Sequence, residues 1–177
     1  EFYIETCPHV PEKLDIEFSV IDLQEEFEKI VYRYFLESYQ NARTPNPCAM
    51  CNPYIKFGLG LKMALDSACD FIASGHYARI KKVDGTNYIQ EALDKSKDQS
   101  YFLYMLTQEQ LKHIKFPLGE YTKPEIREIA EENDLITARK KDSQDICFVP
   151  DGDYVSFIKT YNNKTYPKGQ FVHKSGF

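Results

Sequence analysis

The chain has 177 residues, of which 42% are hydrophobic, and its 13 Tyr and 12 Phe can fill one sizeable core. A net charge of −5 excludes a strongly basic nucleic-acid module, and the absence of a long apolar run excludes a membrane span within these residues. Five cysteines, an odd number, do not fit a secreted disulfide scaffold, so a reducing cytoplasm is the expected location.

The first predicted elements are a strand and a helix. Residues 16–21 first alternate between apolar and polar side chains and then become continuously apolar, a pattern typical of a strand in a sheet. Asp22 then caps an amphipathic run that continues to Phe35 with apolar residues at helical spacing. Because a strand followed by a helix is the repeating unit of a parallel sheet, an α/β fold is predicted.

Next comes a paired-cysteine segment, residues 44–52, with the sequence TPNPCAMCN. Its two prolines keep it extended, because each fixes its own φ and moves the preceding residue out of the helical region. Asn52 is a good N-cap and Pro53 suits a first helical position, so a helix is predicted over residues 53–69. Cys51 would then lie at a helix N-terminus, where the partial positive charge favours a reactive thiolate.

A short buried strand is predicted over residues 71–74, and it ends at Gly75. Ligands of open α/β sheets bind at such strand ends, and a missing side chain allows close approach to the backbone. An ordinary strand-ending glycine explains the same pattern. Asp84 and Gly85 then predict a hairpin turn between two strands, over residues 77–82 and 88–91.

Three elements are predicted in the last third of the chain. Thr122 and Glu125 form a capping box, and the helix that follows should end near Asn133. A second helix is predicted over about residues 153–161, and a strand over residues 170–173.

Five motifs occur in one order over roughly residues 40–160, and together they resemble the tRNA-specific 2-thiouridylases. The motifs are TPNPCAMCN with IKFG, ASGHYARI, KDQSYFLYML, FPLGEYTKPEIREIA and KKDSQDICF. The resemblance implies a partial Rossmann-like domain of the ATP-pyrophosphatase or adenine nucleotide hydrolase type, a parallel sheet with helices on both faces. Residues 1–160 would be the C-terminal part of this catalytic domain, and residues 161–177 the start of a small central domain.

Enzymes of this family are expected to begin with a Ser-Gly-Gly-x-Asp-Ser loop that holds the phosphates of ATP. The chain contains eight glycines but no such loop. By this resemblance the chain is a fragment of a longer enzyme, and we expect it to be inactive by itself.

The family's activity is ATP-dependent 2-thiolation of the wobble uridine of tRNA. The resemblance implies that Cys51 is the nucleophile, that Cys147 carries a persulfide, and that the two thiols form a transient disulfide. It implies that Gly75 contacts ATP and that the enzyme uses ATP together with Mg²⁺. Expected partners are tRNA and a sulfur donor, such as a cysteine desulfurase or a sulfur carrier protein, but no membrane. By the same resemblance, the target base is contacted by Asn46, Pro47 and Cys48. The tRNA is contacted by Lys97, Asp98 and Gln99.

Two departures from the family pattern leave the sulfur chemistry open. Cys48 stands where some members carry Asp, so Cys48, Cys51 and Cys147 could instead hold a four-iron, four-sulfur cluster whose open iron binds sulfide. Asp145 stands where glycine is common, so the loop around Cys147 could have a different shape. The alternative function is a non-catalytic iron–sulfur or zinc protein that binds RNA or a sulfur carrier.

Overall fold

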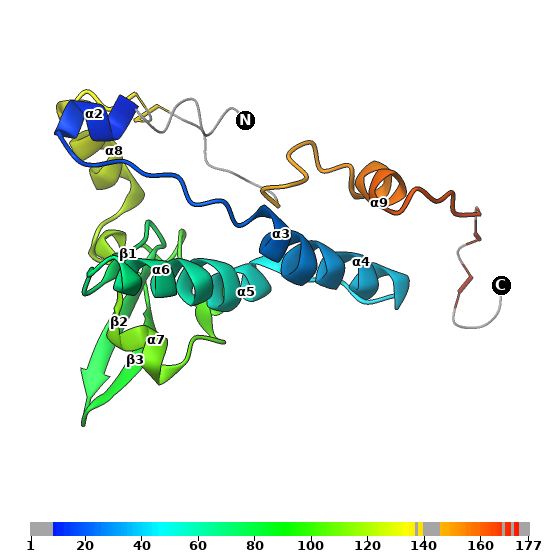
Figure 1. The fold of residues 1–177 in the computed structure, drawn as a ribbon, viewed down its shortest axis with the longest axis horizontal. Helices are drawn as coiled ribbons and strands as arrows, with labels where there is room; N and C mark the ends of the chain where they lie inside the picture. Colours follow the sequence, from blue (N-terminus) through cyan, green and yellow to red (C-terminus); the bar gives the residue numbers. More distant parts are fainter. Residues whose placement is uncertain (1–8, 137, 140–145, 168, 171, 174–177) are drawn as a thin grey trace. The chain divides into compact units, whose positions relative to one another are not determined.

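The computed structural model describes residues 9–136, 138–139, 146–167, 169–170 and 172–173. The chain forms two compact units, residues 1–141 and residues 142–177 (Figure 1). Both sides of the domain boundary predicted near residue 160 lie in the second unit, and that boundary stays a prediction.

The first unit begins with a short helix and an extended segment that leads to a longer helix. Helix α2 covers His9–Leu14, and the longer helix consists of α3 (Gln24–Phe27), η1 (Glu28–Tyr32) and α4 (Arg33–Gln40). The predicted helix after Asp22 is therefore confirmed, and the Asp22 side chain accepts a hydrogen bond from the Gln24 backbone at 3.0 Å.

The strand predicted over residues 16–21 is wrong. These residues form no regular element, and Ile16 and Val20 are 59% and 62% exposed. A strand needs a neighbour that completes its backbone hydrogen bonds, and no described strand pairs with this segment. Alternation alone does not supply that neighbour.

Cys48 and Cys51 lie on a second long helix, the cysteine helix, which consists of α5 (Pro47–Cys51), η2 (Asn52–Gly60) and α6 (Leu61–Asp66). Asn46 is its N-cap and Pro47 its first residue, so the predicted start at Asn52 is wrong. The turns of η2 are wider than those of an α-helix, and the Gln110 amide donates to the carbonyls of Pro53 (2.7 Å) and Phe57 (3.0 Å). This insertion and the missing N–H of Pro53 account for the widening.

Two small sheets follow. Strand β1 (Ile72–Ala73) pairs in parallel with β4 (Ile114–Lys115), which confirms the α/β class. Strands β2 (Ala78–Val83) and β3 (Thr86–Glu91) form the predicted antiparallel hairpin. Its turn residues Asp84 and Gly85 both have positive φ, 47° and 82°, as this tight turn requires.

The remaining elements of the first unit are η3 (Ser100–Leu103), α7 (Gln108–Lys112), η4 (Pro117–Glu120) and α8 (Lys123–Glu132). Helix α8 begins at the predicted capping box and ends at Asn133, so both of its predicted ends are confirmed. In the second unit, α9 (Tyr154–Asn162) confirms the helix predicted over residues 153–161, with Asp153 as N-cap. No strand is present at Gln170, Val172 or His173, and Phe171 lies outside the described residues.

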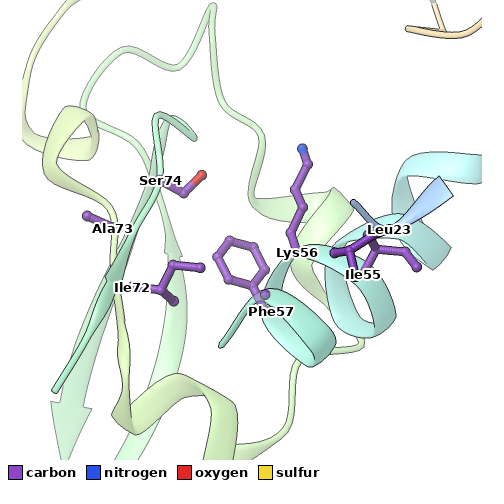
Figure 2. A pocket seen from close by; sticks show the side chains of 8 residues that line it. Leu23, Ile55, Lys56, Phe57, Ile72, Ala73 and Ser74 are labelled. Carbon is purple, nitrogen blue, oxygen red and sulfur yellow. The ribbon is translucent and has the colours of Figure 1, made fainter. Parts of the chain in front are cut away.

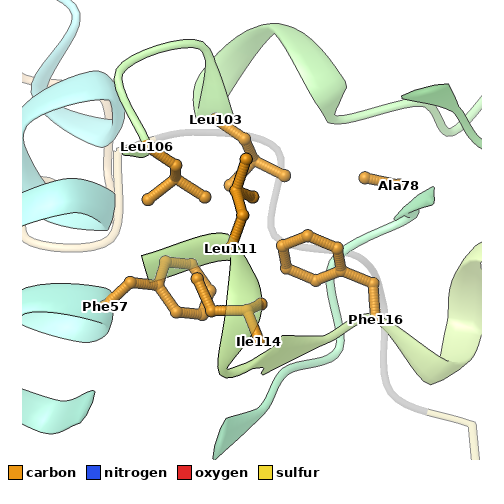
Figure 3. Close-up of a cluster of buried hydrophobic side chains, with 7 residues drawn as sticks. All are labelled: Phe57, Ala78, Leu103, Leu106, Leu111, Ile114 and Phe116. Atoms are coloured by element: carbon orange, nitrogen blue, oxygen red, sulfur yellow. The ribbon is translucent and has the colours of Figure 1, made fainter. Parts of the chain in front are cut away.

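The core of the first unit lies between the cysteine helix, the hairpin and the segment from η3 to η4. Figure 3 shows its side chains, which come from six elements or their flanks. Phe57 and Leu103 are almost completely buried, and each such side chain contributes about 2 kcal/mol of hydrophobic stabilisation. The members are Phe57, Ala78, Leu103, Leu106, Leu111, Ile114 and Phe116.

Candidate active site

Two thiols lie near the start of the cysteine helix. Cys48 is the second helical residue and Cys51 the fifth, and both are half-buried and outside any disulfide. Residues three apart in a helix lie on one face, so the two side chains share a face. The partial positive charge of a helix start declines within its first turn, so it acts on Cys48 more than on Cys51, contrary to the prediction.

Asn46 and Pro47 fix this helix start. The Asn46 side chain accepts a hydrogen bond from the Ala49 backbone at 3.2 Å, and its own N–H donates to the Tyr34 hydroxyl at 3.3 Å. Pro47 is buried. The paired-cysteine segment, predicted to be extended, therefore forms a capped helix start that is held against α4.

Lys97, Asp98 and Gln99 lie in the loop between β3 and η3. Both carboxylate oxygens of Asp98 are used within the chain, by the Ala92 N–H (2.8 Å) and by the Ser100 hydroxyl (2.6 Å). The Gln99 side chain accepts from the Tyr77 N–H at 3.0 Å, and the Gln99 N–H donates to the Tyr77 carbonyl at 2.8 Å. Asp98 and Gln99 therefore shape this loop, and their predicted contact with tRNA stays a prediction.

Asn52 joins the cysteine helix to this second segment. Its side chain is 1% exposed and donates to the Phe102 carbonyl of η3 at 3.2 Å, while its buried oxygen has no hydrogen-bond partner among the described residues. The sequence alone does not indicate this role, because it also fits an N-cap at Asn52. Only the contact with η3, which lies 50 residues away in the chain, reveals it.

A pocket of about 300 Å³ lies beside the carboxyl end of β1. Figure 2 shows the Phe57 ring between Ile72 and Ile55, with the amine of Lys56 and the hydroxyl of Ser74 directed to the same side. The pocket thus combines an apolar wall with two polar groups at the edge where open α/β sheets bind ligands. Its other lining residues are Leu23, Gly60 and Ala73.

Gly75 directly follows this pocket wall. A Cβ atom added there would meet only Leu118 Cδ1, at 3.6 Å, which is ordinary van der Waals contact, and Gly75 does not have a positive φ. The local fold therefore does not require glycine at this position. Its predicted contact with ATP stays a prediction.

His76 is buried next to Phe57, one of the residues that line the pocket. Its ring packs against the rings of Phe57 and Phe116, with centroids 5.8 and 5.9 Å away, and its Nδ1 lies 2.6 Å from the Ser74 hydroxyl. Burial and the nearby charge of Lys56 lower the pKa of His76 from 6.5 to about 4. His76 is therefore neutral at pH 7, as a packed, hydrogen-bonded histidine.

This lowered pKa predicts a stability that depends on pH. Between pH 6.5 and about 4, His76 takes up a proton more readily in the unfolded chain than in the folded one. Its contribution is therefore complete above pH 6.5 and is lost as the pH falls towards 4, by up to roughly 3 kcal/mol. Urea unfolding midpoints between pH 4 and 7 measure this loss. His76→Gln should flatten that part of the profile, and an unchanged profile in this variant would contradict the assignment.

Cys147 lies in the second unit, on a turn before α9. Its side chain is exposed, whereas Val149 is 2% exposed and the Phe148 ring contacts Phe157 at a centroid distance of 5.3 Å. The packed neighbours hold the turn and leave the thiol accessible. Asp145 lies outside the described residues.

Within the described residues, no three His, Cys, Asp or Glu side chains gather into a metal site. The searched helices also include none with the length and apolar character needed to cross a membrane.

The parallel strand pair, with helices before and after it and a pocket at its carboxyl end, is typical of a partial α/β domain. The chain belongs to the family described as tRNA methyl transferase HUP domain, whose model matches residues 3–151.

Proteins named tRNA-specific 2-thiouridylase MnmA are similar to most of the chain. The protein from Treponema denticola is 48% identical over 98% of the chain, and that from Helicobacter hepaticus is 50% identical over 92%. The protein from Carboxydothermus hydrogenoformans is 44% identical over 99%. In each comparison the chain spans 48% of the relative's length.

Proposed function

We propose that the whole protein carries out ATP-dependent 2-thiolation of the wobble uridine of tRNA. The observation that carries the proposal is the half-buried thiol of Cys51 on a capped helix, in a chain whose relatives are named 2-thiouridylases. The family description refers to methyl transfer instead. Cysteine thiols suit sulfur transfer, because thiolates attack and carry sulfur.

ATP activates the uridine in this proposal. Oxygen O2 of the base attacks the α-phosphorus and pyrophosphate leaves, with Mg²⁺ neutralising its charge. The pocket beside β1 supports a nucleotide here through its apolar wall and the Lys56 amine. Gly75 supports it too, since its backbone is open to a ligand and the fold does not demand glycine.

Cys147 and Cys51 then exchange sulfur. A persulfide on Cys147 attacks carbon 2 with its terminal sulfur, and AMP leaves with the former O2. The Cys51 thiolate next attacks Sγ of Cys147, which breaks the bond to the terminal sulfur and leaves that sulfur on the base. The resulting disulfide between Cys51 and Cys147 is reduced by a cellular thiol, and a cysteine desulfurase or a sulfur carrier protein restores the persulfide.

The target base must leave the anticodon stack, because its carbon 2 has to reach the thiols. Asn46, Pro47 and Cys48 form the helix start that meets the extruded base, and Lys97, with the loop shaped by Asp98 and Gln99, contacts the tRNA. The iron–sulfur route stays the alternative, and the metal content of the whole protein distinguishes it from this persulfide route.

The test is nucleoside mass spectrometry of tRNA after incubation with the whole protein, ATP, Mg²⁺ and a sulfur donor. We expect 2-thiouridine at the wobble position, whereas residues 1–177 alone should give none, because their sequence lacks the phosphate-binding loop. A methylated uridine, or thiolation that does not require ATP, would contradict the proposal. Stoichiometric iron and acid-labile sulfide in the active protein would contradict the persulfide route alone.

A further inference from the structure

Two exposed tyrosines, Tyr101 in η3 and Tyr104 at its C-cap, lie next to the cysteine helix. Side chains three residues apart lie on one face of a 3₁₀-helix, so Tyr101 and Tyr104 share a face. They are 58% and 71% exposed, whereas Leu103 on the same element is completely buried in the core. The core therefore holds η3 by one side and leaves the rings of both tyrosines at the surface.

The Tyr101 ring is held in place. It packs against the Phe102 ring at a centroid distance of 3.8 Å, and the Phe102 carbonyl accepts the hydrogen bond from buried Asn52. Asn52 directly follows Cys51, and α5 contacts η3. An exposed aromatic ring is thus fixed next to the helix that carries both thiols.

The element that carries Tyr101, η3, contacts α5, which carries Cys48. Burial of the hydroxyl, followed by the negative charge of the Cys48 thiolate, raises the pKa of Tyr101 above its usual value of 10. The side chain consequently stays neutral at pH 7 and does not repel an RNA phosphate. Its ring offers a flat apolar surface at the site where the thiols must meet a base.

We propose that Tyr101 is a base-stacking residue that holds the face of the extruded pyrimidine next to the cysteine helix. The inference rests on the proposed tRNA thiolation and adds a binding residue to it. Stacking of a base on an aromatic side chain contributes enough that removing the ring weakens binding by between about fivefold and about 150-fold. The hydrogen bond from Asn52 to the Phe102 carbonyl joins the segment that carries this ring to the helix that carries the thiols.

The experiment uses the whole protein and an anticodon stem-loop RNA with 5-iodouridine at the wobble position, a base that cross-links under ultraviolet light to an aromatic ring stacked on it. RNA affinity is measured at one fixed salt concentration, and the cross-linked peptide is sequenced by mass spectrometry. We expect the cross-link at Tyr101. Tyr101→Ala should abolish it and weaken RNA binding at least about fivefold, while Tyr101→Phe should retain both.

Tyr88→Ala is the matched control, because Tyr88 is 55% exposed but lies on the β2–β3 hairpin. It should leave both the affinity and the cross-link unchanged. A cross-link at another residue, or one that survives Tyr101→Ala, would overturn the stacking role and leave the thiolation proposal intact. Failure of the unaltered protein to bind the RNA would overturn both proposals.

Discussion

Replacing Cys51 by serine in the whole protein is expected to reduce 2-thiouridine formation by on the order of a thousandfold or more. Serine keeps the size of the side chain but removes the nucleophile that releases sulfur from Cys147 to the base. The base should then remain attached to Cys147 through two sulfur atoms, as a covalent adduct that a reducing agent breaks. Mass spectrometry of the protein and of the tRNA nucleosides measures both effects.

Two other cysteine variants separate this role from general effects on thiols. Cys69→Ser should leave activity unchanged, because Cys69 is exposed in the turn after α6. Cys48→Asp should retain activity in the persulfide route, since some family members are expected to carry Asp there. Loss of activity with Cys48→Asp, together with loss of bound iron, would favour a cluster and contradict the proposed role of Cys51.

Gly119→Ala is expected to destabilise the first unit by about 3 kcal/mol or more, and to lower its melting temperature by about 10 °C. A Cβ atom at Gly119 would lie 1.8 Å from the Ala78 carbonyl oxygen and 2.7 Å from the carbonyl carbon. Ala78 is completely buried and belongs to β2, whose pairing with β3 fixes its backbone. Relieving this clash therefore requires η4 to move away from the hairpin. Thermal unfolding followed by circular dichroism measures the resulting loss of stability.

Gly75→Ala is the matched control for this substitution. The added methyl group meets only Leu118, at an ordinary contact distance, so the melting temperature should change by less than about 2 °C. Its effect should appear instead in ATP binding by the whole protein. Equal destabilisation by the two substitutions would show that η4 does not pack on β2 as described.

The confirmed elements are those whose signals lie within a few residues of one another. The Asp84–Gly85 turn requires positive φ, and Thr122 and Glu125 satisfy backbone groups of their own helix, so neither depends on distant parts of the chain. The helix after Asp153 is of the same kind, because its cap bonds Ser156 at 2.9 Å. Such local chemistry can be read directly from the sequence.

The errors concern features that distant residues decide. Residues 16–21 have the alternation of a strand but no paired neighbour among the described residues. Asn52 has the chemistry of an N-cap, yet an earlier cap at Asn46 had already begun the helix, and the Phe102 carbonyl uses the amide of Asn52. In both cases two structures were compatible with the local pattern, and the outcome depended on whether another segment supplied a hydrogen-bond partner.

The sequence by itself determined the family, the identity of the candidate thiols and the positions of the turn and capped helices, because motifs and caps depend on residue types at short spacing. Tertiary structure alone decided which cysteine lies nearest the helix start, that the Asp98 and Gln99 side chains are used within the chain, and that η3, which carries Tyr101, contacts α5. The contacts involved join residues that are 12 positions apart (Asn46 and Tyr34), 22 apart (Tyr77 and Gln99) and 50 apart (Asn52 and Phe102). Packing and hydrogen bonding across such separations are settled only when the whole unit folds.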